Sequence, residues 1–198
     1  MGDGLLPPAR EYRSKESERI RLRLMRIRQI DYSTAPAATR RAHDDHLRIA
    51  RITNMKRTLL RSLPAFDALM TWYTLRDATV PILGERLTTL FAHAISAETD
   101  CLICSTFFRR ILIEAGEDPD HLELDAREQV VLAFARRLGH SPFFVPDEVY
   151  DPLRELFDED AIVTLTGFGA LMVATNVVNN ALDIPLDEYL EPYAKGER

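Results

Sequence analysis

Cysteine, tryptophan and glycine are scarce in this sequence, which has two, one and eight of them in 198 residues. The two cysteines, Cys101 and Cys104, are only three positions apart, so they cannot form the framework of disulfides that holds small secreted domains together. There is also no Gly-rich phosphate-binding loop and no hairpin signal of the Asn-Gly kind. These absences exclude a disulfide-stapled fold and argue against nucleotide-loop and β-hairpin proteins.

Export signals and membrane anchors are not expected either. Residues 1–6 lead directly into Pro7-Pro8 and then into dense charge, so we expect a cytoplasmic protein without a signal peptide. Residues 161–182 carry no charge and are nominally long enough to span a bilayer. They contain three asparagines, however, and acids rather than Lys or Arg flank them. We therefore predict a helix at the centre of a core or an oligomer interface, and no membrane partner.

The net charge of −6 conceals an asymmetry along the chain. Residues 1–61 carry 15 Lys and Arg against 7 Asp and Glu, whereas residues 62–198 carry 10 against 24. A basic arm on an acidic body can bind nucleic acid. Because no recognition-helix or aromatic pattern accompanies the basic residues, we instead expect the arm to dock on its own or a neighbouring subunit.

The hydrophobic periodicity is helical over most of the chain and predicts an all-α fold of about seven to nine helices. Residues 1–19 are polar and proline-marked, which predicts a mobile tail. Residues 20–30 alternate apolar and basic side chains, which predicts an extended basic arm. We expect residues 20–198 to form a single domain. Its predicted helices cover residues 37–52, 55–60, 64–79, 85–97, 101–115, 126–138, 147–157 and 161–181, with breaks at Pro81 and Gly84.

The Cys101-Leu-Ile-Cys104 motif falls at the start of a predicted helix. Its sulfurs would then lie one turn apart, where unpaired backbone N–H groups and the helix dipole favour a thiolate. This pattern indicates a redox or disulfide-forming pair. The alternatives are two cysteines buried as small hydrophobes and a zinc site. A zinc site lacks further ligands, because no second Cys pair exists and no histidine has a ligand spacing, so we expect no metal and no cofactor.

The segment Arg86–Phe108 (RLTTLFAHAISAETDCLICSTFF) resembles the core of the carboxymuconolactone decarboxylase and alkylhydroperoxidase AhpD-like family. The family motif is a Glu, eleven residues, Cys-x-x-Cys, and a His four positions beyond the second Cys. Residues 28–69 and 127–190 also look like the family's flanking helices, so the resemblance covers about residues 25–190. It implies an AhpD-like helical fold that assembles as a dimer, trimer or hexamer.

The resemblance also implies roles for the dithiol. In peroxidase members the second cysteine attacks the hydroperoxide and the first resolves it as a disulfide, so Cys104 would be peroxidatic and Cys101 resolving. In the family a Glu and a His form the proton relay, and this sequence differs from the family motif at both positions. Thr89 stands at the position of the Glu and Phe108 at the position of the His. The rate enhancement of roughly 10²–10⁴-fold that general-base catalysis provides would then be missing unless another group acts as the base.

A substitute base is available on the preceding helix. Glu85, Thr89 and His93 are spaced by four and form one stripe, so His93 would lie one turn from the family's Glu position. The alternative for His93 is a satisfied core histidine. Glu98, just before the dithiol, is a further supporting candidate, and we expect Asp100 to cap the helix.

Asparagines interrupt the long apolar segment near the C-terminus. Asn176, Asn179 and Asn180 share one helix face and are expected to cross-link helices or subunits by hydrogen bonds, without a catalytic role.

We therefore predict a thiol-dependent oxidoreductase and, as the more specific hypothesis, a peroxidase that reduces hydroperoxides through a Cys101/Cys104 disulfide cycle with His93 as base. An unidentified thiol or dithiol would be its reductant, and a homo-oligomer its assembly. One alternative is a non-catalytic oligomeric scaffold or binding protein that retains the fold. A third hypothesis is a decarboxylase or lactone-processing enzyme, which needs polar groups that converge in a cofactor-free pocket.

Overall fold

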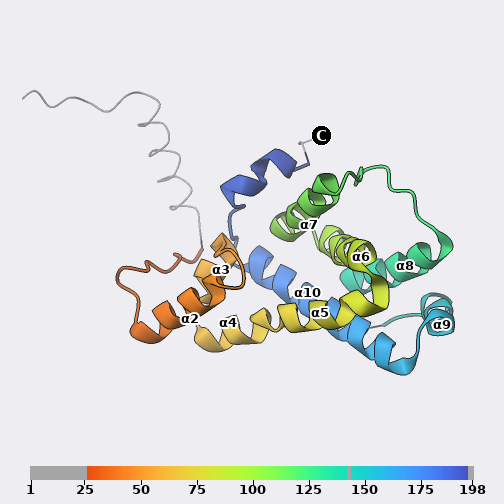
Figure 1. The fold of residues 1–198 in the computed structure, drawn as a ribbon, viewed down its shortest axis with the longest axis horizontal. Helices are drawn as coiled ribbons and strands as arrows, with labels where there is room; N and C mark the ends of the chain where they lie inside the picture. Colours follow the sequence, from red (N-terminus) through yellow and green to blue (C-terminus); the bar gives the residue numbers. More distant parts are fainter. Residues whose placement is uncertain (1–25, 142–143, 196–198) are drawn as a thin grey trace, which may run out of the picture.

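The structure, a computed structural model, describes residues 26–141 and 144–195. Over these residues the chain forms nine α-helices and one 3-10 helix without any strand (Figure 1), so the predicted all-α class is confirmed. The helices are α2 (Ala37–Leu47), α3 (Asn54–Leu59), α4 (Leu63–Met70), α5 (Trp72–Leu83), α6 (Glu85–Glu98), α7 (Leu102–Glu114), α8 (Ala126–His140), α9 (Asp147–Leu156), α10 (Glu159–Ala181) and η1 (Glu188–Tyr193). The predicted tail, residues 1–19, and the first part of the predicted arm lie outside the described residues.

The predicted helix over residues 64–79 is two helices, and its end was placed wrongly. Thr71 separates α4 from α5, and its hydroxyl donates to the Ala68 carbonyl at 2.6 Å, a side-chain bond that competes with the helical pattern. Pro81 was expected to break the chain but lies inside α5. The helix ends two residues later at Leu83, and its C-cap is Gly84, whose φ of 85° is a left-handed conformation that favours glycine.

Three fully buried phenylalanines hold the centre of the fold together. Phe91 of α6 lies between Phe134 of α8 and Phe168 of α10, with ring centroids 6.3 and 6.0 Å apart. Each such ring stabilises the fold by about 1.5–3 kcal/mol relative to an exposed one. Helix α6 is therefore the central element of the core, and α7, α8 and α10 pack around it.

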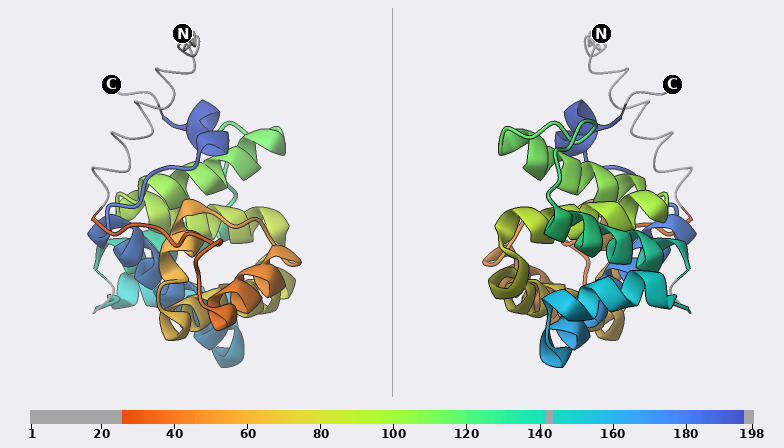
Figure 2. Two further views of the ribbon diagram at one scale, coloured as in Figure 1. Left: turned by 90° about the vertical axis from the view of Figure 1, so that its left-hand side faces the viewer. Right: turned by 90° about the vertical axis from the view of Figure 1, so that its right-hand side faces the viewer.

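Helix α10 is the one helix in the described ranges that is long and apolar enough to cross a membrane. Within the fold it packs against α4, α5, α6, α8 and α9 (Figures 1 and 2). Gly169 permits this close packing, because a Cβ there would lie 2.5 Å from the Leu138 Cδ1 atom of α8. The C-terminal half of α10 buries Thr175, Asn176 and Asn179 beside α6 and α7.

The N-terminal helices form a smaller layer with its own cluster of buried residues, Leu59, Leu60, Phe66 and Leu69. The described end of the basic arm lies against this layer. The Ile30 N–H donates to the Arg57 carbonyl at 3.2 Å, and the Arg26 guanidinium donates to the Ala181 carbonyl at 2.8 Å. Residues 26–30 thus dock on their own chain, and α10 and α3 provide the contacts.

Candidate active site

The dithiol lies where the chain leaves α6 and enters α7. Cys101 is the N-cap residue of α7, so the predicted position of the motif at a helix start is confirmed. Asp100 was expected to cap this helix, but it is exposed, has a φ of 49°, and leaves the cap position to Cys101. The Cys101 N–H donates back to the Ser96 carbonyl at 3.0 Å, which fixes the turn between the two helices.

The amide of Asn179 reaches both sulfurs from α10. Its Nδ2 atom lies 3.2 Å from Cys104 Sγ and 3.6 Å from Cys101 Sγ. Asn179 is buried, and its Oδ1 atom has no hydrogen-bond partner among the described residues. The α10 side chain that contacts the thiols is therefore a hydrogen-bond donor.

The neighbouring asparagines hold the end of α6 against α10. Asn176 Nδ2 donates to the Thr99 hydroxyl at 2.8 Å, and Asn180 Nδ2 donates to the Thr99 carbonyl at 2.8 Å. The prediction that these asparagines cross-link helices is confirmed. Asn179 lies between these two residues in the sequence of α10 and contacts the dithiol instead.

The two thiols have opposite acidities. The pKa of Cys101 is lowered to about 7 by a hydrogen-bonding interaction with the Cys104 thiol, against the effect of burial and with help from the Cys104 and Ile103 backbone N–H groups and the Asn179 amide. The pKa of Cys104 is raised well above its ordinary value, because its thiol donates to Cys101 and because it is buried. The negative charge of the pair therefore resides on Cys101 and the proton on Cys104.

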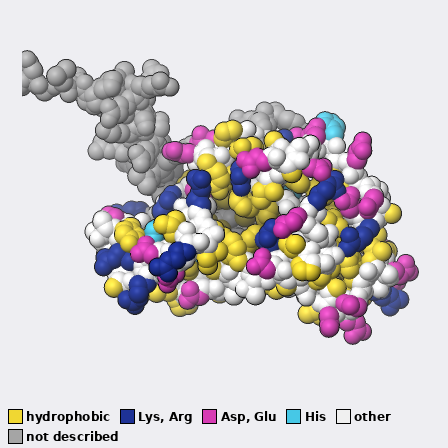
Figure 3. Space-filling view, in the orientation of Figure 1, with side chains coloured by type: hydrophobic (Ala, Val, Ile, Leu, Met, Phe, Trp, Pro, Cys, Tyr) yellow, Lys and Arg dark blue, Asp and Glu magenta, His cyan; other side chains and the backbone are white. Residues whose placement is uncertain are grey.

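Only one of the two sulfurs reaches open space. Cys104, whose residue is 8% exposed, lines a cavity of about 670 Å³, whereas Cys101 is fully buried and does not line it. The cavity lies between α5, α7 and α10, and its size suits a small organic ligand. Figure 3 shows the hollow surrounded by hydrophobic side chains. Its apolar lining includes Met70, Trp72, Phe107, Phe108, Phe168 and Met172.

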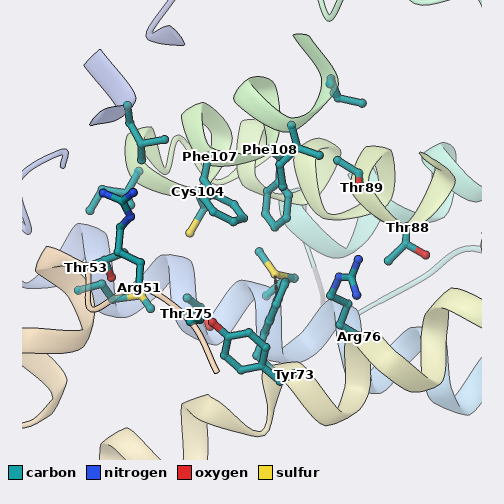
Figure 4. A pocket seen from close by; sticks show the side chains of 18 of the residues that line it. Arg51, Thr53, Tyr73, Arg76, Thr88, Thr89, Cys104, Phe107, Phe108 and Thr175 are labelled. Carbon is teal, nitrogen blue, oxygen red and sulfur yellow. Dashed lines mark hydrogen bonds between the residues drawn. The ribbon is translucent and has the colours of Figure 1, made fainter. Parts of the chain in front are cut away.

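Charged and polar groups lie toward two sides of this cavity. Figure 4 shows Arg51 and Thr53 on one side of Cys104 and Arg76 with Thr88 on the other. On the Arg76 side the cations are paired with acids: Arg76 with Glu85, and Arg86 with Glu117 and Glu128. On the Arg51 side the lining includes Lys56, Tyr73, Asp187 and Tyr189.

The predicted stripe on α6 is only partly directed at the dithiol. Glu85 and Thr89 line the cavity, and the Thr89 hydroxyl donates to the Glu85 carbonyl at 3.0 Å. His93 does not line the cavity, and in the described part of the chain no hydrogen bond joins it to either sulfur. Burial and the Arg109 guanidinium lower its pKa to about 4, and Asp120 and Lys195 are its other charged neighbours.

The remaining predicted positions supply no base. Phe108, at the family's His position, is an apolar wall of the cavity with its ring centroid 6.4 Å from that of Trp72. Glu98 is exposed at the end of α6 and is not part of the cavity lining. Within residues 26–141 and 144–195 no group of three or more His, Cys, Asp or Glu side chains is placed to hold a metal ion.

Sequence reasoning missed two features of the site. Asn179 was noticed as one of three asparagines on an apolar helix, but nothing in the spacing identified the thiols as its partners. Lys56, which lines the same cavity as Cys104, belongs to no recognisable sequence motif. Both features bring together residues that are far apart in the chain.

Comparison with known proteins supports the fold. No family model matches the sequence, and no curated protein matches it significantly. Six chains of solved structures are similar, including two peroxidase-related proteins. One, described as an alkylhydroperoxidase AhpD core, is an uncharacterized peroxidase-related protein from Ralstonia eutropha, with a TM-score of 0.65 and 16% identity over 84% of this chain and 94% of that one. The other is an uncharacterized peroxidase-related protein from Silicibacter sp., with a TM-score of 0.61 and 16% identity over 79% and 88%. The fold is therefore AhpD-like, as the sequence resemblance implied.

Proposed function

We propose that this protein, with its AhpD-like fold, is a thiol-dependent oxidoreductase that reduces hydroperoxides through Cys104 and Cys101. One observation carries the proposal: a free thiol, Cys104, lines a large apolar cavity while it contacts a buried partner thiol of lowered pKa. The similar Ralstonia eutropha structure is that of a peroxidase-related protein, which is consistent with this chemistry.

In the first step Cys101 acts as the general base. As a hydroperoxide approaches in the cavity, Cys104 passes its proton to the Cys101 thiolate and attacks the terminal peroxide oxygen. The O–O bond breaks, Cys104 becomes a sulfenic acid, and the alkoxide takes the proton back from Cys101 to leave as an alcohol. The accessible sulfur thus performs the attack and the acidic sulfur performs the proton transfer.

The second step closes the disulfide. The Cys101 thiolate attacks the sulfur of the Cys104 sulfenic acid, and hydroxide leaves and takes a proton from solvent to become water. The hydroperoxide has then gained two electrons from the pair. An external thiol or dithiol would return the disulfide to the dithiol by exchange.

Asn179 positions the pair throughout these steps. Its Nδ2 group contacts both sulfurs, so it can stabilise negative charge on whichever sulfur carries it. An amide cannot accept the proton, which is why proton transfer is assigned to the dithiol itself. In this way the chain would manage without the family's Glu and His.

The experiment follows thiols and hydroperoxide together in the wild type, Cys104→Ser and Cys101→Ser. We expect the wild type to lose two thiols for each hydroperoxide consumed and to form an intramolecular disulfide. Cys104→Ser should consume none. Cys101→Ser, which also lacks the proposed base, should react more slowly and stop at a sulfenic acid on Cys104 that dimedone labels. Equal rates for the wild type and Cys104→Ser would refute the proposal.

A lactone-processing enzyme or decarboxylase is the second candidate, because the polar side chains of Lys56, Tyr73 and Asp187 converge on the same cavity. Such an activity would survive in the Cys101→Ser/Cys104→Ser double variant, whereas hydroperoxide reduction would not. The open cavity at Cys104 argues against a purely structural scaffold. Homo-oligomeric assembly and a cytoplasmic location stay predictions.

A further inference from the structure

A buried group of polar side chains lies in the cavity on the Arg51 side. Lys56 is 6% exposed, and its Nζ atom donates to the Arg51 carbonyl at 2.8 Å and to the Tyr73 hydroxyl at 2.9 Å. Asp187 is 7% exposed, and its Oδ1 atom accepts the Asn54 N–H at 2.9 Å. We call Arg51, Lys56, Tyr73 and Asp187 the basic end of the cavity.

Several hydrogen-bonding positions of the basic end are unused. Lys56 has three ammonium hydrogens and two acceptors. The Tyr73 hydroxyl accepts from Lys56 but donates to no acceptor in the described part of the chain. Asp187 Oδ2 is buried without a partner among the same residues. Buried polar groups are nearly always satisfied, so the unused donors on Lys56 and Tyr73 indicate a ligand that accepts hydrogen bonds.

The positive charge at this end is only partly compensated. Neither Lys56 nor Arg51 forms an ion pair within residues 26–141 and 144–195, whereas Arg76 and Arg86, the arginines on the other side, both do. Arg51 instead stacks its guanidinium 4.4 Å from the centre of the Tyr189 ring. Asp187 acts on Lys56 without forming an ion pair with it, and burial lowers the pKa of Lys56 only to about 8, so this buried cation stays charged at neutral pH.

The surroundings favour an anionic ligand over a neutral or cationic one. Asp187 is the one acid among the cavity residues at this end, and the cations Arg57, Arg51 and Lys56 all act on it. The local balance is therefore positive. Away from the basic end the cavity becomes apolar, with Trp72, Phe107 and Met172 in its lining.

We propose that the basic end binds the carboxylate of an amphipathic molecule whose apolar chain extends through the cavity past Cys104. Resting on the proposed function, this identifies the substrate class as hydroperoxides that carry a carboxylate on an alkyl chain. Lys56 and Tyr73 donate to the carboxylate, and Arg51 adds long-range attraction at the exposed rim.

Binding can be measured without any thiol chemistry, because Trp72 is the sole tryptophan of the chain and lines the cavity. We would titrate the wild type with decanoate, decanol and decyltrimethylammonium and follow tryptophan fluorescence. A charged hydrogen bond predicts that decanoate binds roughly tenfold or more tighter than decanol. The cation should bind more weakly than either. Equal affinities for decanoate and decanol would overturn the proposal.

Lys56→Met tests the head-group contact, and Lys195→Met is the matched control because Lys195 is exposed and pairs with Asp120 outside the cavity. Lys56→Met should weaken decanoate about tenfold and change decanol by less than about threefold. Lys195→Met should bind both as the wild type does. If Lys56→Met does not fold, as circular dichroism would show, Tyr73→Phe removes one free donor and should weaken decanoate alone. Wild-type affinity for decanoate in either folded variant contradicts the proposal.

Turnover separates this inference from the proposed function. A linear hydroperoxy acid should be reduced with a higher kcat/KM than its methyl ester, and Lys56→Met should remove the preference. Equal reduction of acid and ester would refute the carboxylate site and leave the peroxidase proposal standing. No reduction of either, with decanoate still bound, would refute the peroxidase proposal and leave the carboxylate site standing.

Discussion

The two helices that flank the start of α7 contribute very differently to the dithiol. From α10, the Asn179 amide contacts both sulfurs, and its neighbours Asn176 and Asn180 bind the turn that precedes them. From α6, His93 lies among Arg109, Asp120 and Lys195 and makes no hydrogen bond to the thiols in the described part of the chain. In this chain, then, polar support for the thiols comes from α10.

Helix geometry explains why α6 does not supply the base. A stripe of residues spaced by four drifts by about 40° around the axis at each step, because four residues exceed one turn of 3.6. Glu85 and Thr89 are on the cavity side of α6, and the next step turns His93 away from it. The stripe is real, but its last member faces a different group of charges.

The largest expected effect is that of Asn179→Leu, which removes the donor and keeps a similar volume. Hydroperoxide reduction should fall by about ten- to a hundredfold, since negative charge on the sulfurs loses its amide N–H. Steady-state kinetics with a fixed hydroperoxide measures the loss. Asn180→Leu, whose amide binds the Thr99 carbonyl rather than a sulfur, is the matched control and should stay close to wild type. Equal losses in both variants would mean that α10 acts only through packing.

The pH dependence of the thiols gives the next effect. Because the pKa of Cys101 is lowered to about 7, the pair should bind a proton below that pH and release one above it. Thiolate absorbance in the ultraviolet and the rate of hydroperoxide reduction should both rise as the pH increases through about 7. Asn179→Leu should shift this midpoint upward. A single midpoint at the ordinary cysteine value would show that neither α10 nor the α7 start activates Cys101.

Part of this arrangement could be predicted from the sequence. Helical periodicity predicted α6, α7 and α10, and it placed the Cys101-Leu-Ile-Cys104 motif at the start of a helix. The bounds of α4 and α5 were predicted wrongly for two reasons. The hydrogen bond of the Thr71 hydroxyl to the Ala68 carbonyl accompanies the break between the two helices, and Pro81 is tolerated near the end of α5. The contact of Asn179 with the thiols depends on how α10 crosses α7, which no local pattern contains.

Asn176→Leu should affect stability rather than chemistry. Its amide donates to the Thr99 hydroxyl at 2.8 Å in a buried position between α6 and α10, so the substitution should lower the free energy of unfolding by about 1–3 kcal/mol. Urea denaturation measures the change, and the kinetics of hydroperoxide reduction should stay near wild type at temperatures where the variant is folded. A large loss of activity in a stable variant would extend the site from Asn179 to the whole asparagine face.

The smallest effect is expected for His93→Gln. An imidazole with a pKa of about 4 is a weak base at neutral pH, and His93 is not part of the cavity lining that includes Cys104. The variant should therefore keep kcat/KM for hydroperoxides within about threefold of wild type, with the same midpoint near pH 7 in its pH profile. Steady-state kinetics over a range of pH is the measurement, and thermal unfolding of the same sample is the control. A loss beyond about tenfold in a folded variant would return the proton relay to α6. In that case Cys101 would act only as the resolving thiol, and α6 rather than the dithiol would supply the base.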